Sequence, residues 1–158
     1  MYNDVKTEEI DIAMQEAWKA FHVYRKCTLQ QRANFMRAIA KEIENLGDEL
    51  LITAGKETNL PEARLRNERA RTMYQHTSYA DACEKGDWLE ARINTAVNDV
   101  APPKPDIRKM LVPLGPVVVF GAANFPFAYS TAGGDTASAF AAGCPVIVKA
   151  HPGEAATS

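Results

Sequence analysis

Two unbroken apolar runs, separated by a segment of small residues, constrain this fold more than any other feature of the sequence. The first run is residues 116–121 (PVVVFG) and the second is residues 144–150 (CPVIVKA). Runs that do not alternate with polar residues are typical of parallel strands covered on both faces. The segment 130–142 between them is long enough for a helix and stops at Gly143. The sequence therefore predicts a right-handed strand–helix–strand unit.

The segment between the two runs is rich in alanine and glycine. Gly133 and Gly134 are adjacent and fall inside the predicted helix 130–142. A glycine in a helix interior costs roughly 1 kcal/mol relative to alanine. We therefore expect the backbone of this helix to approach the sheet or a ligand closely.

Residues 1–86 have helical periodicity. Thr7, which precedes two glutamates, is expected to cap a first helix, and Thr28 with Gln31 has the spacing of a capping box. Apolar residues recur at helical spacing in both segments: Ile10, Met14, Ala17, Trp18 and Phe21, then Ala33, Met36, Ile39, Ala40, Ile43 and Leu46. These stripes predict a core rather than a cofactor surface.

Two further helices are predicted in the same region. Gly47 is expected to end the second helix, and Asp48 to cap a short third one. Pro61 suits the first turn of a fourth helix, which should stop near Gly86. This helix carries a basic cluster, interleaved with acidic residues, that predicts a solvated face: Arg64, Arg66, Arg69 and Arg71.

The character of the sequence changes in residues 87–112. Segment 88–97 (WLEARINTAV) is strand-like, and segment 107–115 (IRKMLVPLG) is again extended. Between them, segment 101–106 (APPKPD) is neither helix nor central strand, because its three prolines remove donors and fix φ. We expect either a protruding arm, of the kind that often mediates oligomers, or a packed ribbon.

Composition and charge exclude several classes of protein. The 158 residues are 46% apolar with a net charge of −2, so no basic field favours nucleic acid or an anionic membrane. No apolar run approaches the ~20 residues that span a bilayer, and the N-terminus lacks the pattern of a signal peptide. Three cysteines (Cys27, Cys83, Cys144) and three isolated histidines lack the spacing of a zinc site or a disulfide framework. These features predict a cytoplasmic chain without a metal site.

The usual nucleotide-binding glycine motifs are absent, since neither GxGxxG nor GxxxxGK[ST] occurs in a suitable position. A ligand could still bind at the carboxyl ends of the predicted strands, where Asn124 and Lys149 lie. The Asn124 amide could donate to a developing oxyanion, or it could bond the backbone of its own loop. Lys149 could reach a ribose or phosphate, or it could pair with an acid or extend into solvent. The residues alone leave these alternatives open.

Five motifs between Pro113 and Pro152 resemble the aldehyde dehydrogenase superfamily. They are Pro113-Leu114-Gly115, the strand from Val117 to Phe120, Asn124-Phe125-Pro126, Ala141-Ala142-Gly143 and Lys149. The resemblance implies an α/β fold that begins an incomplete Rossmann-like cofactor domain. Its parts would be N-terminal helices (1–86), a β-strand arm that is a possible oligomerisation element (87–112), and the first βαβ unit (113–158).

The resemblance also implies an activity. Members of the superfamily oxidise aldehydes to acids: a cysteine thiolate attacks the aldehyde, hydride leaves to a nicotinamide cofactor, and water releases the acid. Asn124 matches the oxyanion donor, and Lys149 matches the lysine that bonds the adenosine ribose. Gly121 and Ala122 match loop positions that pass close to the cofactor. Residues 132–152 are most similar to a branch that acts on a short acidic semialdehyde. The implied partners are this small aldehyde and further copies of the chain, without nucleic acid or membrane.

The residues after Lys149 bear on the choice between NAD and NADP. The superfamily often continues with Pro-Ser-Glu, where the glutamate holds both ribose hydroxyls, but residues 150–152 here are Ala-His-Pro. Without that carboxylate a 2′-phosphate is not repelled. His151 could donate to this phosphate, or it could be an ordinary surface histidine. We expect NADP to be preferred over NAD.

The resemblance places the catalytic cysteine, the general-base glutamate and most of the cofactor site beyond Ser158. Cys144 is expected to be a buried structural thiol rather than a substitute nucleophile. We therefore expect these 158 residues alone to be the N-terminal part of an enzyme, without dehydrogenase activity. The alternative is a non-catalytic module that only folds or oligomerises with a partner subunit.

Overall fold

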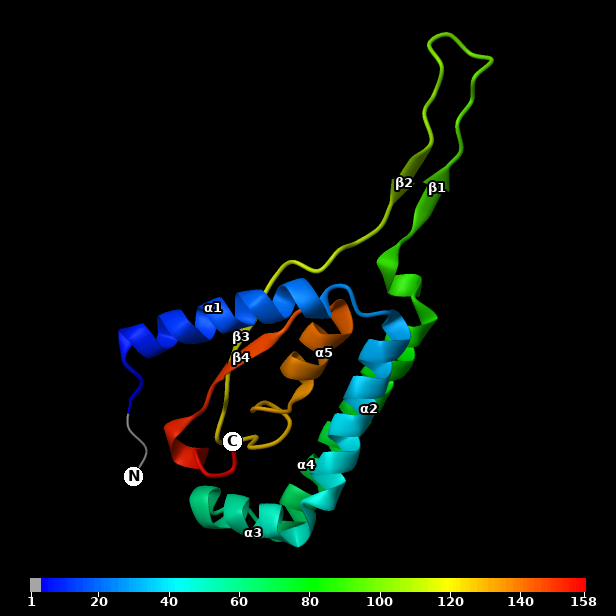
Figure 1. The fold of residues 1–158 in the computed structure, drawn as a ribbon. Helices are drawn as coiled ribbons and strands as arrows, with labels where there is room; N and C mark the ends of the chain where they lie inside the picture. Colours follow the sequence, from blue (N-terminus) through cyan, green and yellow to red (C-terminus); the bar gives the residue numbers. More distant parts are fainter. Residues whose placement is uncertain (1–3) are drawn as a thin grey trace.

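The computed structural model describes residues 4–158 (Figure 1). Its α-helices are α1 (Thr7–Tyr24), α2 (Leu29–Asn45), α3 (Gly47–Thr58), α4 (Glu62–Lys85) and α5 (Gly134–Ala142). Its strands are β1 (Arg92–Asn94), β2 (Ile107–Lys109), β3 (Val117–Phe120) and β4 (Val146–Lys149). Two short 3-10 helices are η1 (Asp87–Leu89) and η2 (Pro152–Glu154). This order confirms the predicted α/β class.

Helices α2 and α4 lie side by side, and α5 packs against both of them and against the sheet of β3 and β4 (Figure 1). Small and apolar side chains fill the junction of α2, α4 and α5: Ala33, Met36, Ala80, Cys83 and Ala141. A second buried cluster joins α3, α4 and the loop before α5: Leu51, Ala54, Leu65 and Phe127. The loop that follows β3 is thus packed between the sheet and α4.

The start of α2 and the end of α4 lie where the sequence predicts them, whereas Gly47, expected to end α2, is the first residue of α3, and Pro61, expected in the first turn of α4, precedes that helix as its N-cap. At the start of α2, the Thr28 backbone N–H donates to Gln31 Oε1 at 2.9 Å, and the Gln31 N–H donates to Thr28 Oγ1 at 3.2 Å. This reciprocal pair is the predicted capping box. At its other end α4 stops at Gly86, whose φ of 73° is readily adopted only without a side chain.

The starts of α1 and α3 differ from the prediction. Lys6 precedes α1, so Thr7 is its first helical residue, and the Lys6 backbone N–H donates to Glu9 Oε2 at 2.8 Å. Asp48 lies inside the first turn of α3 and does not cap it. Its carboxylate instead accepts two hydrogen bonds of 2.9 Å from the Arg66 guanidinium. Attraction across the two helices therefore decides the orientation of Asp48, which local sequence does not reveal.

Strands β3 and β4 are parallel, with Val117 opposite Val146 and Phe120 opposite Lys149. The βαβ unit is therefore confirmed, and both strands end at the same edge of the sheet. Helix α5 covers one face of this sheet. On the sheet, Val118 is 44% exposed and Phe120 is 72% exposed, so part of the apolar strand surface is open.

The small-residue helix is shorter than predicted. It begins at Gly134 rather than at residue 130, and Gly133 precedes it in an extended conformation. The two glycines thus lie at the helix start, where the interior penalty does not apply. The backbone at both glycines does approach its neighbours closely, but these neighbours are the Ala128 backbone and the Gln75 side chain rather than the sheet or a ligand. A Cβ on Gly133 would lie 2.4 Å from the Ala128 carbonyl oxygen, and one on Gly134 would lie 2.7 Å from Gln75 Nε2.

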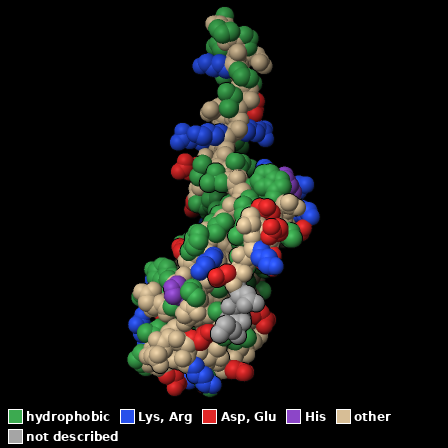
Figure 2. All heavy atoms as spheres, turned by 90° about the vertical axis from the view of Figure 1, so that its left-hand side faces the viewer, with side chains coloured by type: hydrophobic (Ala, Val, Ile, Leu, Met, Phe, Trp, Pro, Cys, Tyr) green, Lys and Arg blue, Asp and Glu red, His purple; other side chains and the backbone are tan. Residues whose placement is uncertain are grey.

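Residues 87–112 form an arm that projects from the body (Figure 1). In the arm β1 and β2 pair antiparallel, and the bridge between Val97 and Lys104 extends the ribbon. The first strand is shorter than predicted, because residues 87–89 form η1. Apolar side chains are visible along the arm and at its base (Figure 2). The exposed ones are Ile93, Val97, Val100, Ile107, Met110, Leu111 and Val112.

The apolar stripe of α1 is only partly a core stripe. Ala17 and Phe21 are buried. Other predicted core positions are between 43% and 58% exposed: Ile10, Met14, Trp18 and Leu46. Within residues 4–158, no helix combines the length and the apolar character needed to cross a membrane.

Candidate functional site

The carboxyl edge of the sheet brings together four of the predicted site residues. The Gly121 N–H donates to the Lys149 carbonyl oxygen at 3.0 Å, which carries the strand pairing one residue beyond β3. The Ala122 N–H donates to the Tyr129 carbonyl oxygen at 2.9 Å, which closes the loop that follows. His151, two residues after Lys149, is the N-cap of η2. We call residues 121–129 the Asn124 loop.

Asn124, in this loop, is exposed. Its backbone carbonyl oxygen accepts a hydrogen bond of 2.5 Å from Arg64 Nη2 on α4. Its side-chain amide makes no hydrogen bond to any residue between 4 and 158, so it does not bond the backbone of its own loop. The amide is thus a pair of donors available to a ligand.

Helix α4 holds the Asn124 loop through a carboxylate that the sequence did not single out. Glu68 is only 5% exposed, and its Oε1 accepts hydrogen bonds from the N–H groups of Phe127 at 2.9 Å and Ala128 at 3.0 Å. Its other oxygen, Oε2, is buried and has no partner in the described part of the chain. Glu68 lies four residues after Arg64 and on the same helix face, but this spacing does not indicate that its carboxylate turns inward.

Two more residues of α4 continue this contact. Arg71 donates to the Tyr129 hydroxyl at 3.1 Å, and its guanidinium lies 5.4 Å from the centre of that ring. His76 is fully buried, and its Nε2 donates to the Ala132 carbonyl oxygen at 2.8 Å. Burial lowers the pKa of His76, so the ring is held neutral. The arginines of α4 are therefore not merely a solvated face, because Arg64 and Arg71 tie it to the loop.

A second buried carboxylate lies under the start of the loop. Glu154 is 0% exposed, and its Oε1 accepts from Ser130 Oγ at 2.5 Å and from Ser158 Oγ at 3.2 Å. Burial raises its pKa, although the serine hydrogen bonds act in the opposite direction. A Cβ on Gly121 would lie 3.2 Å from Glu154 Oε1. A side chain at Gly121 would therefore crowd this carboxylate.

Glu57, at the end of α3, fixes the last described residues. Its carboxylate accepts from the N–H groups of Ala156 at 2.9 Å and Thr157 at 2.8 Å, and from Thr157 Oγ1 at 2.7 Å. Burial by itself would raise the pKa of Glu57, but these hydrogen bonds lower it. The segment after η2 is therefore bonded to α3.

Lys149, the last residue of β4, and His151, which follows it, are exposed to solvent to different degrees. Lys149 is exposed, and His151 is half-buried. His151 Nδ1 accepts from the Gly153 N–H at 3.0 Å, so the proton of the neutral ring lies on Nε2. Lys149 and His151 thus offer a cation and an N–H donor at the carboxyl edge, which suits a phosphate or a ribose.

The two buried cysteines do not resemble a nucleophile. Cys144 is 4% exposed and Cys83 is 0% exposed, and burial raises the pKa of the Cys83 thiol. A reactive cysteine needs access and a stabilised thiolate. The expectation of a buried Cys144 is confirmed. Among residues 4–158, no group of three or more His, Cys, Asp or Glu side chains is placed to hold a metal ion.

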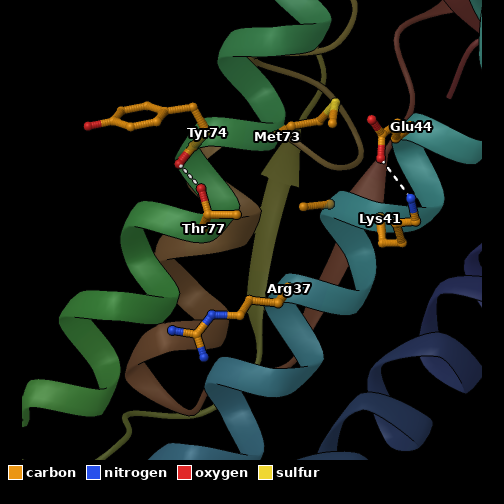
Figure 3. A pocket seen from close by; sticks show the side chains of 7 residues that line it. Arg37, Lys41, Glu44, Met73, Tyr74 and Thr77 are labelled. Carbon is orange, nitrogen blue, oxygen red and sulfur yellow. Dashed lines mark hydrogen bonds and ion pairs between the residues drawn. The ribbon is translucent and has the colours of Figure 1, made fainter.

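A shallow hollow of about 360 Å³ lies between α2 and α4, away from the carboxyl edge (Figure 3). Figure 3 shows Arg37, Lys41 and Glu44 on one helix and Met73, Tyr74 and Thr77 on the other. Lys41 pairs with Glu44 at 2.9 Å. Arg37 pairs with Asp81 and Glu84, each at 2.6 Å. The charged side chains that line the hollow are therefore paired within the chain, and we do not take the hollow as the candidate site.

This chain has a parallel βαβ unit with donors at the carboxyl edge of its sheet. These features are typical of open α/β folds that bind ligands. The comparison with known proteins is more specific. The chain belongs to the aldehyde dehydrogenase family, which it matches over residues 2–158. The structure is also similar to a 1-pyrroline-5-carboxylate dehydrogenase, with a TM-score of 0.83 and 24% identity, covering 98% of this chain and 28% of that one.

Two curated relatives are α-ketoglutaric semialdehyde dehydrogenases. The protein of Acinetobacter baylyi is 46% identical over 159 residues, covering 100% of this chain and 30% of the relative. The α-ketoglutaric semialdehyde dehydrogenase 2 of Azospirillum brasilense is 52% identical over 151 residues, covering 95% of this chain and 29% of the relative. The chain therefore spans about 30% of the length of these relatives. The resemblance read from residues 113–152 is confirmed.

Proposed function

We propose that this chain is the N-terminal part of an enzyme that oxidises α-ketoglutarate semialdehyde to the carboxylic acid. The observation that carries the proposal is the identity of 46% and 52% to two dehydrogenases of that name, which extends along nearly the whole chain. In this reaction a cysteine from another part of the complete protein forms a thiohemiacetal with the aldehyde. By themselves, these 158 residues would be inactive.

The residues at the carboxyl edge fit a dinucleotide. Lys149 would bond the adenosine ribose, and the Gly121–Ala122 backbone would pass beside the cofactor. When bound, the cofactor supplies the hydride acceptor. Asn124 would donate its amide to the aldehyde oxygen as negative charge develops there, which supports its role because the amide has no competing partner in residues 4–158.

NADP is the proposed cofactor. A carboxylate that reaches the ribose hydroxyls would repel a 2′-phosphate. The nearest carboxylate after Lys149 is Glu154, and it is fully buried and bonded to Ser130. His151, with its proton on Nε2, offers a donor to the phosphate. Both observations favour NADP over NAD.

The proposal is tested with the complete protein that carries this chain. Its kcat/KM is measured for α-ketoglutarate semialdehyde, succinic semialdehyde and benzaldehyde, each with NADP and with NAD. We expect the highest value for α-ketoglutarate semialdehyde with NADP. A much higher value with NAD would refute the cofactor assignment, and equal values for all three aldehydes would refute the substrate assignment.

We further propose that the arm, residues 87–112, contacts a second copy of the chain in a homo-oligomer. Its exposed apolar residues support this, because monomeric proteins rarely leave a long apolar ribbon in water. The three free cysteines agree with a reducing compartment such as the cytoplasm. Light scattering of the complete protein with Ile93→Lys and Ile107→Lys in the arm should show a smaller assembly.

A further inference from the structure

The backbone of the Asn124 loop is held by one carboxylate, that of Glu68. Glu68 Oε1 accepts from two consecutive backbone N–H groups, those of Phe127 and Ala128. Two bonds to one oxygen fix the orientation of two neighbouring peptide planes. These planes follow directly after Pro126, whose own φ is fixed by its ring. The loop backbone from Asn124 to Ala128 therefore has little conformational freedom.

The burial of Glu68 is costly. A carboxylate taken out of water is unfavourable unless it is fully hydrogen-bonded. Glu68 is 5% exposed, and its Oε2 is buried without a partner in residues 4–158. A buried acceptor oxygen without a partner among these residues calls for an explanation.

The rest of the loop transmits the constraint to Asn124. The Phe125 N–H donates to the Ala122 carbonyl oxygen at 3.0 Å, and the Tyr129 N–H donates to the Phe125 carbonyl oxygen at 3.1 Å. Arg64 holds the carbonyl oxygen of Asn124 itself. Glu68 and Arg64 are one helical turn apart on α4, so one rigid element holds the loop on both sides of Pro126.

We propose that Glu68 is a positioning residue, which holds the Asn124 loop so that the Asn124 amide meets the aldehyde oxygen. This inference rests on the proposed function, because Asn124 must be the oxyanion donor. Such a donor acts only if it is held close to its productive geometry. A displacement of about 1 Å can cost about 10²-fold in rate. Glu68 touches neither substrate nor cofactor in this role.

The test is a double-mutant cycle in the complete protein. Asn124→Ala should lower kcat about 10²–10³-fold, and Glu68→Ala should lower it about 10–10²-fold with little change in the KM for the aldehyde. The double variant should be no slower than Asn124→Ala alone, because Glu68 acts through Asn124. Glu68→Gln keeps an acceptor oxygen and should restore most of the turnover. Glu62→Ala, an exposed glutamate of the same helix, is the matched control and should leave kcat unchanged.

Hydrogen exchange gives a readout that does not depend on activity. Amides of residues 124–132 should exchange faster in Glu68→Ala than in the parent or in Glu68→Gln. If Glu68→Ala does not fold, Glu68→Asp takes its place. Its shorter side chain cannot reach both N–H groups, so the same loss of kcat and faster exchange are expected.

The outcomes separate the two claims. If Asn124→Ala leaves kcat unchanged, Asn124 is not the oxyanion donor, and the role of Glu68 falls with it. If Asn124→Ala is slow but the Glu68 variants keep full turnover, only the positioning role is overturned. It is also overturned if the two losses multiply in the double variant, because Glu68 then acts independently of Asn124.

Discussion

Arg64 Nη2 lies 2.5 Å from the carbonyl oxygen of Asn124, and the Arg64 guanidinium lies 5.0 Å from the centre of the Phe125 ring. One side chain of α4 thus contacts both the peptide of Asn124 and the residue after it. The Asn124 side chain is left without a partner in the described residues. The backbone of this residue is restrained, and its amide has no competing partner among residues 4–158, which agrees with the proposed role as an oxyanion donor.

Asn124→Ala should lower kcat of the complete protein about 10²–10³-fold, because the donor to the developing oxyanion is lost. The KM for NADP should change little, since the backbone at Gly121 and Ala122 is untouched. Steady-state kinetics at saturating aldehyde measure both values. Asn45→Ala, at an exposed asparagine of α2, is the control. A kcat within twofold of the parent would make Asn124 a structural residue.

The cofactor assignment predicts different effects at Lys149 and His151. Lys149→Ala should raise the KM for NADP and for NAD about 10–100-fold, because a charge-assisted hydrogen bond is worth about 1.5–3 kcal/mol. His151→Ala should raise the KM for NADP alone, about 2–10-fold, because the lost bond is to the 2′-phosphate. Lys56→Ala, at an exposed lysine of α3, controls for loss of charge. An equal rise for both cofactors in His151→Ala would place His151 elsewhere than at the 2′-phosphate.

The sequence specifies the parts of this structure that depend on neighbours along the chain. The Thr28–Gln31 capping box, the end of α4 at Gly86 and the parallel pair of apolar strands follow from local patterns. The hold of α4 on the Asn124 loop does not. Glu68 and Phe127 are 59 positions apart, and no periodicity indicates which carboxylate turns inward. Helix α5 begins later than predicted because residues 128–134 form a turn in which the Gly134 N–H donates to the Ala128 carbonyl oxygen at 3.0 Å, and helical spacing alone does not reveal this turn.

Glu154→Gln should stabilise the fold more at high pH than at low pH. Burial raises the pKa of Glu154 above its ordinary value of 4.5. The folded chain therefore keeps this proton at pH values where the unfolded chain has released it, and its stability falls as the pH rises above 4.5. Glutamine keeps the acceptor for Ser130 without this dependence. Urea denaturation at pH 5 and pH 8 measures the difference. A gap between variant and parent that shrinks from pH 5 to pH 8 would contradict the assignment.

Glu57→Gln should behave in the opposite way. Hydrogen bonds from Thr157 and Ala156 lower the pKa of Glu57 below its ordinary value of 4.5. This carboxylate therefore stabilises the fold at pH values above 4.5, and its contribution disappears as the pH falls through the lowered pKa. The variant should lose about 1–2 kcal/mol at pH 7, and this loss should be smaller at pH 2.5. Thermal unfolding at the two pH values tests this, and a loss that persists unchanged in acid would rule it out.

Gly133→Ala should destabilise the fold more than Gly134→Ala. The φ of Gly133 is −77°, which any residue adopts, so the effect is purely one of space. Its Cβ would lie 2.4 Å from the Ala128 carbonyl oxygen, which is backbone and cannot turn away, whereas the Cβ of Gly134 would meet the Gln75 side chain, which can. We expect a loss of about 1–3 kcal/mol or more for Gly133→Ala and a smaller one for Gly134→Ala. Urea denaturation of both variants ranks them, and the reverse order would show that the backbone between Ala128 and Gly133 yields more easily than Gln75.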